Sequence, residues 1–167
     1  MTVKRAGLVL GMGLFGSLAA AQQPAGPATA PAANPNVDYF FRYLNRLDPA
    51  QGWHRTVSGL RYRKVSGSAA GPRPTVADTV TIHYVGRFID GVEFDSSVAR
   101  GQPATFPLPR LIRGWQEGVP LMQVGERFEF AIPAPLAYGL TGRGPIPGGA
   151  TLLFTVELIA IATPAAG

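Results

Sequence analysis

The sequence of 167 residues contains no cysteine and only two histidines, His54 and His83. Without cysteine, the chain has no disulfide bond, no thiolate nucleophile and no cysteine-ligated zinc site. A metal site built on the histidines would need a carboxylate partner, and the spacing of the acidic residues does not suggest one. We therefore expect neither a metal ion nor a cofactor, and we expect His83, in an alternating stretch, to be structural.

Charged residues are also scarce, at 15% of the chain, whereas glycine (21) and proline (16) are plentiful. This composition favours a turn-rich domain with more strand than helix. Taking Lys4 and Arg5, which lie in a segment that we expect to be removed, from the 15 basic residues leaves 13 against 10 acidic ones. The arginines are scattered singly, without the cluster that phosphate binding favours, so we expect no nucleic-acid partner.

The first 21 residues show the three parts of a secretory signal. Lys4 and Arg5 precede an apolar run over residues 6–18, and small residues follow up to Ala21, after which we expect cleavage. The run is shorter than the roughly 20 residues that span a bilayer, so an uncleaved anchor is the weaker alternative. The sequence predicts an exported protein, periplasmic or extracellular, with no stable membrane insertion after signal cleavage.

Two segments beside the folded part lack hydrophobic periodicity. Residues 22–36 are rich in Pro and Ala, with Gln and Asn, and cannot bury enough apolar surface to offset the entropy lost on ordering. We predict a disordered tether at 22–36 and a disordered tail at 163–167.

Residues 37–50 are predicted to form a short helical segment. Phe40, Leu44 and Leu47 recur at helical spacing, and Pro49 ends the pattern. The segment either packs on the main domain, which is the simpler interpretation, or docks a partner protein.

The main domain is predicted to occupy residues 51–162 and to consist mostly of antiparallel strands. Side chains alternate between two faces in stretches at residues 60–65, 80–84, 128–132 and 152–159, and Asp90-Gly91 indicates a hairpin turn. The last stretch is apolar on both faces, at Leu153 and Ile159, which is typical of a strand in the middle of a covered sheet.

One short helix is predicted in this domain. Ile112, Trp115 and Val119 fall at helical spacing, and Pro120 ends the run. The economical architecture is an α+β fold, in which a curved antiparallel sheet of about five strands wraps around one short helix and leaves a pocket at the end of that helix. Gly114 would allow a ligand to approach the indole of Trp115 closely.

Five short motifs follow one another between residues 80 and 158. They read Ile82-His83-Tyr84-Val85-Gly86, Phe94-Asp95-Ser96-Ser97, Leu111-Ile112-Arg113-Gly114-Trp115, Ala137-Tyr138-Gly139 and Ala150-Thr151-Leu152-Leu153-Phe154. In this order and spacing they resemble the FKBP family of peptidyl-prolyl cis/trans isomerases. The resemblance implies the FKBP fold, with a five-stranded sheet around a short helix and a pocket for proline peptides between them.

The resemblance also implies which residues form the site. Six are implied to be catalytic: Tyr84, Asp95, Ile112, Trp115, Tyr138 and Phe154. Five more are implied to contact the substrate: Phe94, Leu111, Ile146, Arg100 and Arg143. The Trp115 indole would carry the prolyl ring, and the Tyr138 hydroxyl and the Ile112 backbone N–H would each bind a substrate carbonyl. Asp95 would be a wall carboxylate braced by Tyr84 and Arg100.

The chain departs from the eukaryotic-type members of the family at three places. Ala104 stands where those domains commonly have a wall aromatic, the loop 107–110 is about two residues shorter, and Arg143 replaces a loop histidine. These departures predict a more open wall and a changed preference for substrates and macrolides.

The resemblance implies an isomerase that turns X-Pro bonds of unfolded or nascent exported polypeptides, with macrolide inhibitors as further candidate ligands. Such catalysis needs no nucleophile, metal or cofactor, because no bond to carbon is made or broken. A non-catalytic proline-peptide-binding chaperone on the same fold is the first alternative, and an interaction module whose specificity lies in residues 39–47 is the second. We expect a monomer, because the long helical dimerisation segment of some exported family members is absent.

Overall fold

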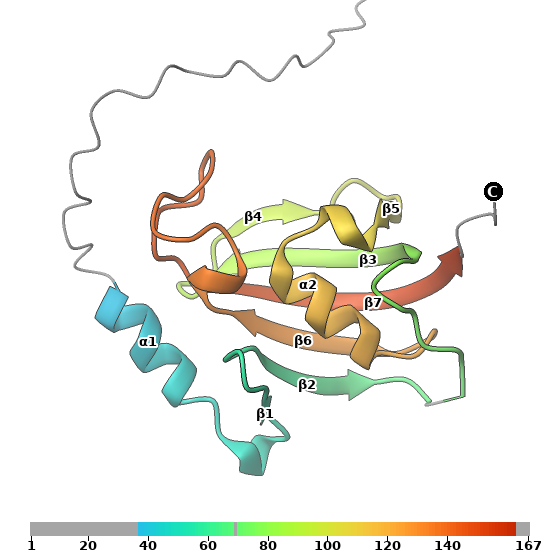
Figure 1. Cartoon of the computed structure of the whole chain (residues 1–167), viewed down its shortest axis with the longest axis horizontal. Helices are drawn as coiled ribbons and strands as arrows, with labels where there is room; N and C mark the ends of the chain where they lie inside the picture. Colours follow the sequence, from blue (N-terminus) through green and yellow to red (C-terminus); the bar gives the residue numbers. More distant parts are fainter. Residues whose placement is uncertain (1–36, 69, 163–167) are drawn as a thin grey trace, which may run out of the picture. The chain divides into compact units, whose positions relative to one another are not determined.

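The computed structural model describes residues 37–68 and 70–162 (Figure 1). The predicted signal at 1–21, the tether at 22–36 and the tail at 163–167 lie outside the described residues. Within the described ranges, no helix is long and apolar enough to cross a membrane.

The described residues form one antiparallel sheet in the order β1-β2-β6-β7-β3-β4, with β5 beside β3. The strands are β1 His54–Arg55, β2 Arg61–Ser66, β3 Thr79–Phe88, β4 Glu93–Ser96, β5 Ala104–Pro107, β6 Arg127–Ile132 and β7 Leu152–Ala162. The α+β fold is confirmed. The sheet has two strands more than the five predicted, because the short β1 and β5 pair at its edges.

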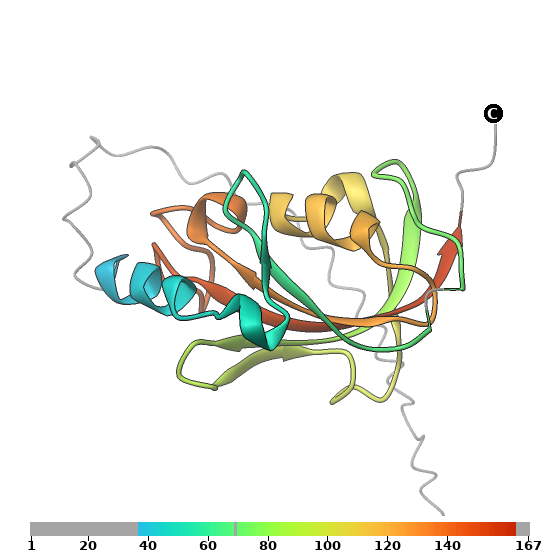
Figure 2. The ribbon, with the colours of Figure 1, turned by 90° about the horizontal axis from the view of Figure 1, so that it is seen from below.

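The helices are short. They are α1 Val37–Asn45 and α2 Arg113–Gly118, with 3-10 turns η1 Pro49–Gln51, η2 Leu108–Arg110, η3 Val119–Leu121 and η4 Ala134–Leu136. Figure 2 shows α2 lying across one face of the curved sheet. Asp90 and Gly91 form the predicted hairpin turn between β3 and β4, where Gly91 takes the positive φ of 91° that glycine accommodates.

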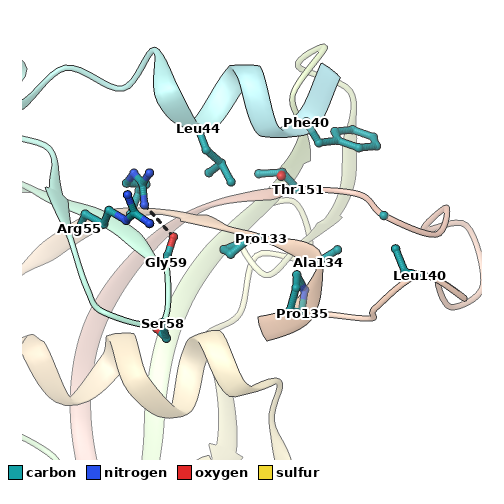
Figure 3. Close-up of a pocket in the computed structure, with 12 residues that line it drawn as sticks. Phe40, Leu44, Arg55, Ser58, Gly59, Pro133, Ala134, Pro135, Leu140 and Thr151 are labelled. Carbon is teal, nitrogen blue, oxygen red and sulfur yellow. Dashed lines mark hydrogen bonds between the residues drawn. The ribbon is translucent and has the colours of Figure 1, made fainter. Parts of the chain in front are cut away.

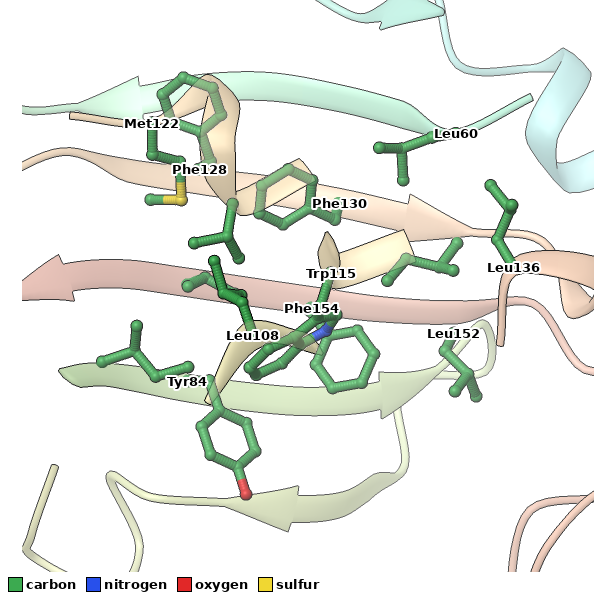
Figure 4. Packing of buried hydrophobic residues seen from close by; sticks show 14 of the residues in the cluster. Leu60, Tyr84, Leu108, Trp115, Met122, Phe128, Phe130, Leu136, Leu152 and Phe154 are labelled. Carbon is green, nitrogen blue, oxygen red and sulfur yellow. The ribbon is translucent and has the colours of Figure 1, made fainter. Parts of the chain in front are cut away.

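The central position predicted for the last strand is confirmed, since β7 pairs with β6 on one side and β3 on the other. Alternate β7 residues, beginning at Leu152 and Phe154, belong to the main core beneath α2 (Figure 4). On the opposite face, Leu153 packs with Leu44 of α1 and with Trp53. Ile159 lies beyond this second cover and is exposed.

Helix α1 covers part of the second face, as the simpler interpretation of residues 37–50 predicted. Leu44 is buried with Trp53 and Ala131, and Phe40 packs against the main core. Asp48 then caps η1 by accepting a hydrogen bond from the Ala50 backbone N–H at 2.8 Å.

Two glycines explain how α2 approaches the sheet so closely. A Cβ added at Gly114 would lie 2.4 Å from the Ile132 side chain, and one at Gly118 would lie 2.7 Å from the Phe130 ring. Both glycines therefore face the sheet, one helical turn apart. The interpretation of Gly114 as a point of ligand approach is wrong: its missing side chain makes room for Ile132.

Candidate functional site

A cavity of about 260 Å³ opens at the beginning of α2, where the helix meets β3, β4 and β7. Its lining is mostly aromatic and apolar, with charged groups at the edge. The lining residues are Tyr84, Phe94, Asp95, Phe106, Arg110, Leu111, Ile112, Trp115, Tyr138, Arg143 and Phe154.

The indole of Trp115 is the centre of an aromatic cluster. Its ring meets the rings of Tyr84, Phe154 and Phe106 edge to face, at centroid distances of 5.3, 5.1 and 6.3 Å. Figure 4 shows the indole between Tyr84 and Phe154. Such contacts fix the orientation of the indole, which is only 5% exposed. Its buried Nε1–H has no hydrogen-bond partner among the described residues.

Gly86 on β3 allows two of the cavity's rings to pack against the strand. A Cβ at this position would lie 2.8 Å from both the Phe154 and the Phe94 ring. These two rings meet at 89° with their centroids 5.7 Å apart. The glycine that ends the first sequence motif is therefore needed for the aromatic wall.

Asp95 forms the predicted charged brace with Tyr84 and Arg100. The Tyr84 hydroxyl donates to Asp95 Oδ2 at 2.5 Å and accepts from Arg100 Nη2 at 2.9 Å, while Arg100 Nη1 also donates to Asp95 Oδ1. Partial burial alone would raise the pKa of the Asp95 carboxyl, but the hydrogen bonds from Tyr84 and Arg100 outweigh it and hold this pKa below its usual value.

The same contacts act on Tyr84. Burial, and then the hydrogen bond to Asp95, raise the pKa of the Tyr84 hydroxyl. At neutral pH the site therefore holds an ionised carboxylate and a neutral phenol, and the charge of Asp95 is already matched by Arg100.

Two hydrogen-bond donors at the cavity have no acceptor among the residues that the structure describes. Among the described residues, neither the Tyr138 hydroxyl nor the Ile112 backbone N–H makes a hydrogen bond. Tyr138 follows η4, and the guanidinium of Arg143 lies 6.0 Å above its ring. Ile112 is the N-cap residue immediately before α2, in extended conformation.

Nine of the eleven predicted site residues line this single cavity. The two others lie behind its wall. Arg100 contacts the wall through Asp95 and Tyr84. Ile146 is 9% exposed and packs in the main core, where its backbone pairs with Arg143.

Sequence reasoning missed Phe106 and Arg110, both of which line the cavity. Phe106 shares a face of β5 with Ala104, so the strand supplies an aromatic ring two residues beyond the position where the sequence suggested an open wall. Ala104 and Phe106 do alternate as in a strand, but Pro103 and Pro107 argue against a strand in a stretch this short.

The cavity is suited to holding an apolar ring. It has no nucleophile poised beside a base, and no group of three or more histidine, aspartate or glutamate residues that could hold a metal lies within the described ranges. Its chemistry is that of shape, aromatic surface and hydrogen-bond donors.

Comparison with known proteins identifies the family. The sequence model of FKBP-type peptidyl-prolyl cis-trans isomerases matches residues 71–159. The FKBP-type peptidyl-prolyl cis-trans isomerase FkpA of Aeromonas hydrophila is 51% identical over 124 residues, covering 74% of this chain and 46% of the relative. FK506-binding protein 2 of Yarrowia lipolytica is 47% identical over 102 residues, covering 59% of this chain and 71% of the relative.

A solved structure agrees with these matches. The crystal structure of FkpA from Escherichia coli superposes with a TM-score of 0.74 at 37% identity, covering 77% of this chain and 60% of that one. The fold and the aromatic cavity thus define a domain of the proline-isomerase class. The chain belongs to the family of FKBP-type peptidyl-prolyl cis-trans isomerases. The chain spans about half the length of the bacterial relatives that it matches. The matched regions cover 46%, 58% and 45% of three such relatives.

Proposed function

We propose that this protein accelerates cis/trans rotation of X-Pro bonds in unfolded or nascent polypeptides. The observation that carries the proposal is the fixed indole of Trp115, surrounded by aromatic rings, beside the two unused donors of Tyr138 and Ile112. A prolyl ring fits on such a surface, and the flanking carbonyls of a peptide are acceptors for such donors.

The physical task is to lower a rotational barrier of about 18–20 kcal/mol, which arises from amide resonance. Twisting the amide localises its charge, so the twisted state depends less on water than the planar one does. A largely apolar cavity therefore favours the twisted state over the planar state. Contacts to the prolyl ring, made by Trp115, Phe94 and Phe154, can offset the cost of holding the amide twisted.

The hydrogen-bonding groups have separate roles in this mechanism. The Tyr138 hydroxyl and the Ile112 N–H hold substrate carbonyls, so that rotation occurs about the X-Pro bond alone. Asp95, already bound to Tyr84 and Arg100, shapes the wall and exchanges no proton with the substrate. Leu111 adds apolar wall, and Ile146 supports the loop that carries Arg143.

The substrates favoured by this cavity are those with an acidic side chain near proline. Arg110 and Arg143 both line the cavity, both are exposed, and neither makes an ion pair within the described residues. An acidic residue beside the proline would meet one of these guanidinium groups, whereas a lysine would be repelled. We expect kcat/KM to be about fivefold higher for a Glu-Pro peptide than for the matched Lys-Pro peptide at low salt.

The place of action is proposed to be outside the cytoplasm. Residues 1–21 carry the signal pattern, and a relative from Legionella longbeachae, 44% identical over 105 residues, is named an outer membrane protein. The product of cleavage after Ala21 would begin at Gln22, and the mass of the secreted protein tests this directly.

An isomerisation assay tests the activity. The purified protein is expected to accelerate the cis-to-trans relaxation of a short proline peptide, and a macrolide that occupies the cavity is expected to inhibit it. An unchanged relaxation rate would contradict catalysis. In that case, undiminished binding of the same peptide would identify the non-catalytic chaperone instead.

A further inference from the structure

A second and larger cavity, of about 310 Å³, lies beneath α1 (Figure 3). It is separate from the cavity around Trp115 and shares none of its lining residues. Its lining comes from α1, from the β1–β2 region, from η4 and from the loop that follows η4. The lining residues are Phe40, Leu44, Arg55, Ser58, Gly59, Arg61, Pro133, Ala134, Pro135, Leu140, Gly149 and Thr151. We call this cavity the α1 groove.

Two sides of the α1 groove are apolar. Leu44 points into it from α1, and Pro133 and Ala134 face Leu44 from the opposite side (Figure 3). Leu140, which is 61% exposed, stands at its open end. The apolar surface would be covered by an apolar segment of a ligand.

The third side carries two arginines at adjacent positions. Arg55 of β1 and Arg61 of β2 are directly opposite each other in the strand pairing. Side chains in such a pair lie side by side, and like charges there repel. Arg61 is only 8% exposed, and its guanidinium makes one hydrogen bond, from Nη1 to the Gly59 carbonyl at 2.9 Å.

Neither arginine has a carboxylate partner within the described residues, whereas five other cations have one. The contrast is sharpest on β2 itself, where Arg63 pairs with Glu129 at 2.7 Å. The nearby Glu117 binds the Ser58 hydroxyl at 2.6 Å and forms no ion pair with Arg55 or Arg61.

The uncompensated charge also affects Arg61 itself. Burial, and then the charge of Arg55, lower the pKa of the Arg61 guanidinium. A ligand carboxylate between the two guanidinium groups would remove the repulsion and use their free N–H donors. The missing partner is therefore an anion, and the adjoining surface requires that the anion be attached to apolar groups.

We propose that the α1 groove binds an apolar polypeptide segment that carries an aspartate or glutamate side chain. The arginine pair takes the carboxylate, and the half-buried Pro133 and the exposed Pro135 and Leu140 cover the neighbouring apolar side chains. The choice of a polypeptide rests on the proposed function, in which unfolded chains are the substrates. The chain's own residues 22–36 contain no acidic residue and so cannot supply the carboxylate. The groove would thus give the protein a second binding site for an unfolded polypeptide, away from the prolyl bond.

A pair of proline-free peptides tests the α1 groove without involving the isomerase cavity. The probe is fluorescein-labelled Ala-Leu-Phe-Glu-Leu-Leu with both ends blocked, and its partner has Gln in place of Glu. Fluorescence polarisation with the purified protein is expected to give an affinity about tenfold higher for the Glu peptide, because a charge-assisted pair replaces a neutral contact. Arg55→Gln, at an exposed position, is expected to remove most of that difference.

The controls locate the site and separate the possible ligands. Arg46→Gln, which changes an exposed arginine outside the groove, is expected to keep the tenfold preference. An excess of a proline tetrapeptide should not displace the probe. Equal affinities for the two peptides, or a preference that survives both Arg55→Gln and Arg61→Gln, would overturn the proposal. So would tight binding of dodecanoate at Arg55 and Arg61 with no binding of the Glu peptide, since the ligand would then be a lipid carboxylate. None of these failures would alter the isomerisation rate of the unaltered protein.

Discussion

The cavity around Trp115 and the α1 groove are of similar size, about 260 and 310 Å³, but they differ in how their charges are balanced. In the first, Asp95 is bound by Tyr84 and Arg100. In the second, Arg55 and Arg61 face each other, and neither has a carboxylate partner in the part of the chain that the structure describes. A carboxylate that is already paired within the protein, such as Asp95, stabilises the cavity wall and does not require a charged ligand. An unpaired charge, such as that of Arg55 and Arg61, favours a ligand that carries the opposite charge.

The two tryptophans allow a direct test of this comparison, because Trp115 lies in α2 and Trp53 packs against α1. Trp115→Leu is expected to lower kcat/KM for a proline peptide by roughly tenfold to a hundredfold, since the surface beneath the prolyl ring is lost. Trp53, which is 8% exposed and packs with Leu44, provides the matched control. Trp53→Leu should lower the free energy of unfolding but leave kcat/KM per folded molecule unchanged. Equal losses of activity in the two variants would show that the indole of Trp115 has no special role.

A single added methyl group is expected to disrupt the close packing of α2 against the sheet. Gly114→Ala would place a Cβ 2.4 Å from the Ile132 side chain, so the helix must move outward or Ile132 must leave its rotamer. We expect the free energy of unfolding in urea to fall by about 2 kcal/mol. Arg113→Ala, at the exposed neighbouring position, controls for helix propensity and should change stability by less than about 0.5 kcal/mol. Similar stability of the two variants would mean that the packing against Ile132 is looser than described.

Gly114 also shows where sequence reasoning reaches its limit. The sequence indicated that the glycine next to Trp115 mattered, but not which side of the helix it faced. Eight of the nine predicted residues that line the cavity were predictable because the motifs carry them at family spacing, and Arg143 was assigned from its place in the family's loop. Phe106 was missed because β5 is four residues long, follows Pro103 and ends at Pro107, which leaves too little periodicity to detect. Arg110 was missed because it lies in η2, a turn of three residues that has no periodic signal.

The α1 groove could not be predicted at all from the sequence. It depends on the register that places Arg55 opposite Arg61, and a strand of two residues gives no periodic signal. The position of α1 over Leu153 is a tertiary contact as well. What the sequence did predict was that β7 is covered on both faces, which follows from side-chain polarity alone.

The balanced charge of the first cavity should be visible in the pH dependence of stability. Because the folded-state pKa of Asp95 lies below its unfolded value, its contribution is present above the unfolded pKa of roughly 4 and is lost as the pH falls through the folded pKa. Asp95→Asn should flatten the urea stability profile in that acidic range. At pH 7 we expect a loss of less than about 1 kcal/mol, since the side chain is 43% exposed and screened by solvent.

Glu93→Gln is the control for this measurement, because Glu93 lies on the same strand, β4, and pairs with Arg87 of β3 outside the cavity. Exposed ion pairs contribute little, so its profile should follow that of the unaltered protein. A profile for Asp95→Asn that is no flatter than that of Glu93→Gln would contradict the balance attributed to Tyr84 and Arg100.

For the α1 groove, removing one of the two unpaired charges is expected to stabilise the protein, whereas removing Asp95 is expected to destabilise it. Without ligand, Arg61→Met should raise the free energy of unfolding by about 0.5 kcal/mol, because it removes a buried charge that is repelled by Arg55 and keeps an apolar chain of similar length. Arg63→Met on the same strand should lower it, since Arg63 pairs with Glu129 and lies 4.9 Å above the Trp53 ring. Urea unfolding of the two variants at pH 7 measures both changes. If both substitutions destabilise the protein, the contacts of Arg61, such as its hydrogen bond to the Gly59 carbonyl, outweigh the repulsion from Arg55.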